Sequence, residues 1–144
     1  MDFEIIEGAE NMRVEDAVRL LKPTYWAGKR SPETIERSMR NSMCYGVRVP
    51  GEKRLVGFAR VITDLATTWY LCDVIIDPAY RGRGLGRALV GHIASRPEFK
   101  GLRGFLITRD AHGLYSHFGV ETVDGRVMMK VPAVPGGTET HDER

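Results

Sequence analysis

The sequence lacks the features that mark secreted, zinc-binding and membrane proteins. It has two cysteines in 144 residues, Cys44 and Cys72, which cannot form a disulfide framework and have no zinc-site spacing. Both lie in apolar runs, so we expect buried free thiols. No apolar run approaches the roughly 20 residues of a membrane span. The N-terminal residues Met1-Asp2-Phe3-Glu4 are acidic, so we expect no signal peptide and take the cytoplasm as the default location.

The sequence also lacks an excess of either charge. Twenty-one basic and 19 acidic residues leave a net charge of +2, which is too small to indicate nucleic-acid binding by itself. The length and the 42% hydrophobic content predict one domain with its own core. We place this domain at residues 1–131 and expect a flexible tail at 132–144, where Pro, Gly and charged residues dominate.

The most informative stretch runs from residue 73 to 89. An apolar, β-branched run stops at Asp77-Pro78, and an apolar helical pattern begins near residue 85. Between them lies the glycine loop, residues 81–87, with Gly at 82, 84 and 86 and Arg at 81, 83 and 87. Glycine lets a ligand approach the main chain, and amides at a helix N-terminus attract anions. The spacing fits neither the Walker loop nor the dinucleotide fingerprint, so the loop predicts a different phosphate cradle.

Hydrophobic periodicity and turn residues predict alternating strands and helices. We expect helices at 11–21, 32–42, 84–95 and 111–118, with Ser31 and Asp110 as N-caps. Strands are expected at 3–7, 44–49, 55–63, 67–76, 104–108 and 127–131. Short turns make the second to fourth strands an antiparallel meander. The helical crossover should make the fourth and fifth strands parallel neighbours.

Two motifs resemble those of the GCN5-related N-acetyltransferases. Ile76-Asp77-Pro78-Ala79-Tyr80-Arg81-Gly82-Arg83-Gly84-Leu85-Gly86 is similar to that family's Arg/Gln-x-x-Gly-x-Gly/Ala loop after a strand and a proline. Ala111-His112-Gly113-Leu114-Tyr115-Ser116-His117-Phe118-Gly119-Val120 is similar to its Ala-x-x-Leu-Tyr-x-x-x-Gly-Phe segment. The resemblance implies an α/β fold. Its sheet would be mixed and mostly antiparallel, with six to seven strands, about four helices and splayed central parallel strands.

The resemblance also implies an activity, acetyl transfer from acetyl-CoA to a primary amine, with no metal. The acceptor is unknown, and a small molecule is favoured over a protein. By this resemblance, residues 81–86 hold the CoA pyrophosphate, and Arg87 is a charged neighbour. Backbone groups of Val74, Ile75 and Ile76 pair with pantetheine and polarise the thioester carbonyl. The matching residues are Arg81, Gly82, Arg83, Gly84, Leu85 and Gly86. Thr108 stands where many members have a CoA-binding Asn.

The resemblance names Tyr115 as the general acid, which would protonate the leaving thiolate. The alternative is a tyrosine that packs the last helix on the sheet. The base is less defined. Asp73 lies in an apolar strand, and burial would raise its pKa toward neutrality. It could equally be a structural carboxylate paired with a buried donor. Two other residues are candidates for the base. They are His112 and Asp110, and the alternative role of Asp110 is that of a helix cap.

Tyr25 and Trp26 lie where this family builds its acceptor site, and an aromatic wall could hold an ammonium group. The alternative is that Trp26 fills the core; Arg30, Glu33 and Trp69 are weaker pocket candidates. Two other functions stay open: a non-catalytic acyl-CoA-binding module on the same fold, and an interaction module. The second would use the basic residues Arg81, Arg83, Arg87, Arg96 and Lys100. A homodimer is common in such proteins.

Overall fold

The computed structural model describes residues 2–132 of the chain. These residues fall into two compact units; the first ends at Leu106, the second begins at Ile107, and each is described by itself. The prediction of a single domain over residues 1–131 therefore stays a prediction. Of the expected tail, residues 133–144 lie outside the described part.

The first unit is built on a five-stranded sheet with the order β1-β2-β3-β4-β5. All neighbours are antiparallel except β4 and β5, which are parallel, so the predicted meander and crossover are confirmed. The strands are β1 (Glu4–Glu7), β2 (Met43–Arg48), β3 (Gly57–Thr63), β4 (Thr68–Ile76) and β5 (Arg103–Phe105).

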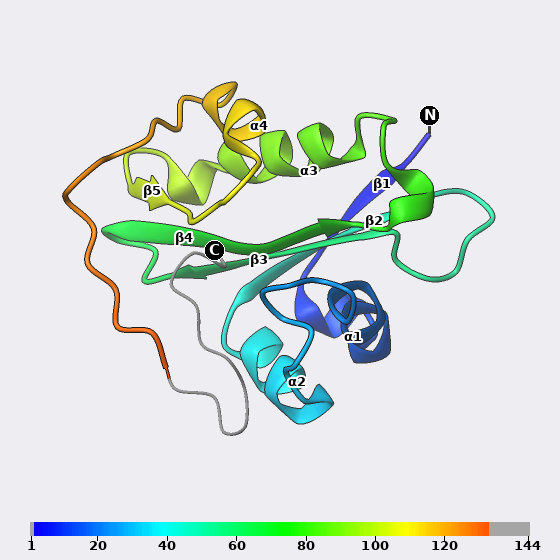
Figure 1. Ribbon diagram of the computed structural model, residues 1–144. Coiled ribbons are helices and arrows are strands. Elements are labelled where there is room, and N and C mark those ends of the chain that lie inside the picture. Colours follow the sequence, from blue (N-terminus) through cyan, green and yellow to red (C-terminus); the bar gives the residue numbers. More distant parts are fainter. Residues whose placement is uncertain (1, 133–144) are drawn as a thin grey trace. The chain divides into compact units, whose positions relative to one another are not determined.

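Helices cover both faces of this sheet (Figure 1). The helices α1 (Val14–Leu21) and α2 (Pro32–Arg40) lie on one face, and α3 (Leu85–Ala94) lies on the other. The core under α1 and α2 contains buried apolar residues from both helices and from the sheet, among them Leu21, Ile35, Met39, Phe58 and Ile75. No helix among residues 2–132 is long and apolar enough to cross a membrane.

The predicted capping of α2 is confirmed, whereas the start of α1 was placed too early. The Ser31 hydroxyl accepts a hydrogen bond from the Thr34 amide at 3.1 Å, and Pro32 occupies the first helical position. Helix α1 begins at Val14 instead of residue 11, because a short 3-10 turn (Ala9–Asn11) precedes it. The Asn11 side chain donates to the Glu7 carbonyl at 2.8 Å, which favours this turn over an earlier helix start.

The second unit contains the short helix α4 (His112–Ser116). Its N-cap is Ala111 and not Asp110, so that prediction was wrong: the Ala111 amide donates to the Thr108 hydroxyl at 3.0 Å. Gly119 (φ 81°) closes the helix, as expected, with its amide donating to Ser116 at 3.1 Å. The predicted strand at 127–131 is wrong. Among the described residues nothing pairs with it, and a single extended segment without a partner does not form a sheet.

Candidate functional site

The parallel strands β4 and β5 pair over only three residues each. Thr68, Trp69 and Tyr70 face Arg103, Gly104 and Phe105, and β4 then continues to Ile76 with no β5 partner. This confirms the predicted splay of the central strands. Val74, Ile75 and Ile76, the residues expected to contact pantetheine, lie in the part of β4 beyond this pairing. Their contact with a ligand stays a prediction.

The glycine loop follows β4 through a 3-10 turn, Pro78–Tyr80. Gly82 and Gly84 adopt left-handed backbone angles, φ 78° and 82°, and Gly84 is the N-cap of α3. A Cβ atom placed on either glycine would have no other atom within 4 Å, so open space lies above the backbone at both positions. An approaching ligand could therefore reach the main chain here.

The three arginines of the loop add positive charge to this exposed stretch of the chain. Arg81, Arg83 and Arg87 are exposed. The Arg81 Nε donates to the Ile76 carbonyl at 3.0 Å, and the Arg83 guanidinium lies 5.3 Å from the centre of the Tyr80 ring. Left-handed glycines at a helix start, together with exposed guanidinium groups, suit the phosphates of acetyl-CoA.

Asp73 lies in a bulge of β4. Cys72 pairs with Arg60 and Ile75 with Phe58, so two β4 residues, Asp73 and Val74, stand opposite one β3 residue. Asp73 has φ 57°, one of two non-glycine residues with a positive φ in the described chain. This conformation is strained for most residues but tolerated by Asp, and strain of this kind is concentrated at functional sites.

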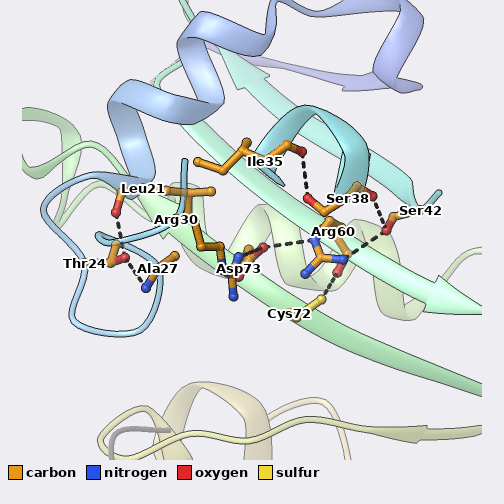
Figure 2. Close-up of polar contacts among 10 residues, drawn as sticks. All are labelled: Leu21, Thr24, Ala27, Arg30, Ile35, Ser38, Ser42, Arg60, Cys72 and Asp73. Carbon is orange, nitrogen blue, oxygen red and sulfur yellow. Dashed lines mark hydrogen bonds and ion pairs between the residues drawn. The ribbon is translucent and has the colours of Figure 1, made fainter. Parts of the chain in front are cut away.

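The carboxylate of Asp73 is almost completely buried between two arginines, an arrangement shown in Figure 2. Its Oδ2 accepts hydrogen bonds from Arg30 Nη1 at 2.8 Å and from Arg60 Nε at 2.9 Å. Arg60 Nη1 donates in turn to the Ser42 hydroxyl at 3.0 Å. Asp73 Oδ1 is buried and has no hydrogen-bond partner within residues 2–132. We call Asp73, Arg30, Arg60 and Ser42 the Asp73 cluster.

These contacts reverse the expected pKa shift of Asp73. Burial, the largest single influence, would raise the pKa, as the sequence predicted. The positive charges of Arg30 and Arg60 and their hydrogen bonds together outweigh burial, so the pKa of Asp73 lies below its ordinary value. Burial would lower the pKa of Arg60, but the charge and hydrogen bond of Asp73, together with Cys72 and Cys44, outweigh burial and raise this pKa. The prediction of a raised pKa was wrong. The alternative prediction, a structural carboxylate paired with a buried donor, agrees with the hydrogen bonds from Arg30 and Arg60.

Two residues of this cluster, Arg60 and Ser42, were not predicted from the sequence, and Arg30 was predicted only as a pocket residue. The signal for Arg60 was a charged residue inside the apolar strand Gly57–Thr63. A buried charge requires an opposite charge, and the neighbouring strand carries Asp73. The sequence separation of 13 residues hid the pair until the register of β3 and β4 was known.

Tyr25 and Trp26 lie in the segment between α1 and α2 with their rings edge to face, 5.0 Å apart. Tyr25 is exposed, while Trp26 packs partly buried against the core. Trp26 therefore has the core-filling role that the sequence left open, and the predicted acceptor contact of either ring stays a prediction. Trp69 stacks on Phe99 at 5.2 Å, a packing role.

The remaining predicted residues belong to the second unit. Tyr115 lies in α4 and is 9% exposed. His112 is exposed at the start of the same helix, and Asp110 is exposed before it. Thr108 is half-buried, and its hydroxyl accepts the hydrogen bond from Ala111 that orients the start of α4. The roles of Tyr115 and Thr108 stay predictions.

A cavity of about 900 Å³ is lined by other residues of the first unit. It is formed by the end of β1, the 3-10 turn after it, the second half of α2 and the start of β2. Of the Asp73 cluster only Ser42 lines it, and no glycine-loop residue does. We therefore place the candidate donor site at the loop and the splayed strands. Within residues 2–132, no three His, Cys, Asp or Glu side chains gather as metal ligands would.

Known proteins share both the fold and part of the sequence. A protein of Xanthomonas campestris pv. campestris assigned to the GNAT acetyltransferases is 35% identical; the match covers 94% of this chain and 96% of that one, with a TM-score of 0.84. A GNAT-family acetyltransferase of Streptococcus pneumoniae TIGR4, 23% identical, covers 91% and 98% with a TM-score of 0.73 and shows the fold alone.

The histone acetyltransferase TAP1 of Glycine max is 49% identical over 39 residues, which are 27% of this chain but only 17% of that protein. Its match carries no acceptor over to this chain. The description of the acetyltransferase (GNAT) family matches residues 13–120, three quarters of the sequence. Members of this family in general use acetyl-CoA. This chain therefore belongs to the GNAT family of acetyltransferases.

Proposed function

We propose that this protein transfers the acetyl group of acetyl-CoA directly to a primary amine, in a complex that holds both substrates. The observation that supports this most is the glycine loop, with two left-handed glycines open to solvent at the start of α3. This loop follows the strand that separates from β5. A phosphate-binding loop next to two strands that separate suits a donor with phosphate groups at one end and an extended chain that carries the acetyl group.

In this proposal acetyl-CoA supplies an acetyl thioester, which is already activated toward amines. The loop amides from Gly82 to Gly86 bind the phosphates, and the backbone of Val74, Ile75 and Ile76 holds the pantetheine arm. Fixed N–H groups there would stabilise the negative charge that develops on the carbonyl oxygen. Tyr115 would donate a proton to the departing thiolate. The amine nitrogen forms the new C–N bond and loses a proton to solvent as the C–S bond breaks, and solvent returns a proton to Tyr115.

A thiol-release assay tests this function. Purified protein with acetyl-CoA and a panel of small amines should release CoA thiol, while a peptide panel tests a protein acceptor. The protein contributes little background, because Cys44 and Cys72 are buried and burial raises the pKa of Cys44 to about 12. CoA binding without thiol release over both panels would favour the non-catalytic acyl-CoA-binding module.

The role proposed for Tyr115 is tested by Tyr115→Phe. We expect kcat to fall about a hundredfold with little change in the KM for acetyl-CoA, since only the proton donor is lost. Ser116→Ala, an exposed change on the same helix, is the matched control and should leave kcat within about twofold. Undiminished turnover in Tyr115→Phe would remove this assignment.

The general-base prediction for Asp73 is tested by the pH dependence of kcat/KM in Asp73→Asn. With its pKa below the ordinary value, Asp73 is ionised throughout the neutral range. A base with such a pKa gives no acid limb near pH 7, so a limb of the wild-type profile in that range should persist in the variant. Its disappearance in Asp73→Asn would establish Asp73 as the base.

A further inference from the structure

Helix α1 carries one buried acidic side chain, Asp16, and one partly buried basic side chain, Arg19. Asp16 is 4% exposed, and its Oδ2 accepts a hydrogen bond from the Leu55 amide at 3.3 Å. Arg19, one turn later on the same helix, donates through Nη2 to the Leu55 carbonyl. The backbone of Leu55, two residues before β3, is therefore held by α1 at both of its polar groups.

Arg19 has a second contact, and it reaches the start of the donor site. Its Nη1 donates to Asp77 Oδ2 at 3.0 Å, and both side chains are largely shielded from solvent. Asp77 is the last residue before the 3-10 turn that leads into the glycine loop. The guanidinium thus connects the helix, the segment before β3 and the loop through a single group with several fixed donors.

Asp77 is fixed in three directions. Its amide donates to the Val56 carbonyl at 2.8 Å, and its Oδ1 accepts from the Ala79 amide at 2.9 Å, which shapes the turn. The pKa of Asp77 is lowered, first by the Ala79 hydrogen bond and then by Arg19, so its carboxylate is charged at neutral pH. Among the described residues, only Arg19 links the Asp77 carboxylate to helix α1. This helix lies on the face of the sheet opposite to α3, the helix that follows the loop.

We propose that Arg19 is a positioning residue for the phosphate-binding loop, acting through Asp77. This inference rests on the proposed binding of acetyl-CoA. It adds a residue that lies outside the glycine loop, 62 positions before Arg81. Loss of Arg19 would leave Asp77 free to turn on its remaining contacts. The direction in which the amides after Gly82 point would then no longer be fixed.

A comparison of two donors tests this proposal. Acetyl-CoA binding is measured by calorimetry, and binding of S-acetylpantetheine, which lacks the phosphates, is measured by NMR titration. In Arg19→Ala we expect the Kd for acetyl-CoA to rise about tenfold, the scale of a lost hydrogen bond to a charged group, while the Kd for S-acetylpantetheine stays within twofold. Arg19→Lys keeps the charge but only one of the two contacts and should lose about threefold.

Arg13→Ala, at the N-cap of the same helix, is the control, because the Arg13 side chain is exposed and its one ion pair within residues 2–132 is with the exposed Glu15 at 3.8 Å. It should bind both donors as the wild type does. An equal loss for the two donors in Arg19→Ala, or no loss for either, would overturn the positioning role. A wild-type protein that does not bind acetyl-CoA would instead overturn the proposed function, and this inference with it.

Discussion

The glycine loop and the Asp73 cluster both belong to β4 or to the residues just after it, yet they are built in opposite ways. The loop is mostly exposed and made of consecutive residues, and its proposed binding groups are main-chain amides. The cluster is buried, and its charges come from β3, β4 and the segment before α2. In the loop the important property is the missing Cβ; in the cluster it is the balance of three charges.

This difference predicts different consequences of substitution. A change in the loop should weaken donor binding and destabilise the fold less than a change in the cluster, because little packs against Gly82 or Gly84. A change in the cluster should mainly destabilise the fold, because an unbalanced charge would remain inside the protein. The substitutions below distinguish two roles. One is a binding surface formed by the backbone, and the other is support of the fold by charged side chains.

The largest effect is expected for Asp73→Asn, which leaves Arg30 and Arg60 without a buried counter-charge. We expect the free energy of unfolding at pH 7 to fall by about 3–5 kcal/mol. Because the folded-state pKa of Asp73 is lowered, its stabilisation is present above the unfolded pKa of about 3.9 and is lost as pH falls through the folded value. Urea unfolding at pH 7 and pH 3 should show the difference shrinking in acid.

Two variants control this prediction. Glu36→Gln breaks an exposed ion pair with Arg40, 3.8 Å long, and should cost less than about 0.5 kcal/mol. Adding Arg60→Met to Asp73→Asn removes one unbalanced charge and should restore part of the stability. If Asp73→Asn costs no more than Glu36→Gln, the cluster does not support the fold.

The next effect concerns the loop and uses two glycines with the same backbone angle. Gly84 and Gly101 both have φ 82°, and a Cβ on either would have no atom within 4 Å. Alanine at either position should therefore destabilise the fold equally, by about 1–2 kcal/mol. Only Gly84→Ala should weaken CoA binding, because its methyl group would separate the loop amides from the phosphate. We expect a loss on the order of a hundredfold, since each hydrogen bond from an amide to a charged phosphate contributes about 1.5–3 kcal/mol.

Calorimetric titration with CoA and thermal unfolding of both variants give the two quantities. Equal CoA affinities for Gly84→Ala and Gly101→Ala would show that the open space above Gly84 is not where the phosphates bind. The contrast between loop and cluster would then no longer be one between binding and stability.

Local sequence signals predicted most of the fold. The Ser31-Pro32 start of α2, the meander of β2, β3 and β4, and the crossover through α3 all depend on residues close together in the chain. The errors have the same physical origin. The pattern at 127–131 suits a strand, but a strand also needs a partner. Asp110 suits an N-cap, but Thr108 already accepts the hydrogen bond from Ala111.

The same reasoning explains which parts of the candidate site could be predicted. The glycine loop lies within seven consecutive residues, so glycine spacing alone identified it. The Asp73 cluster joins residues 13 and 43 positions apart, and no local pattern shows which arginines reach Asp73. Burial alone gave the wrong direction for its pKa, because the direction depended on partners that only the folded chain brings together.

The smallest effect is expected for Arg87→Gln, and it asks whether the loop binds through charge or through backbone. Arg87 is exposed in the first turn of α3, so water and salt screen its attraction to phosphate. We expect the Kd for CoA to rise about threefold at low salt and to be unchanged at 1 M salt, where the Debye length is about 3 Å. Arg37→Gln, an exposed change on α2, should have no effect at either salt concentration. A loss that persists at 1 M salt would mean that Arg87 makes a shielded contact with the donor. Side-chain charge, and not the glycine backbone alone, would then account for binding at the loop.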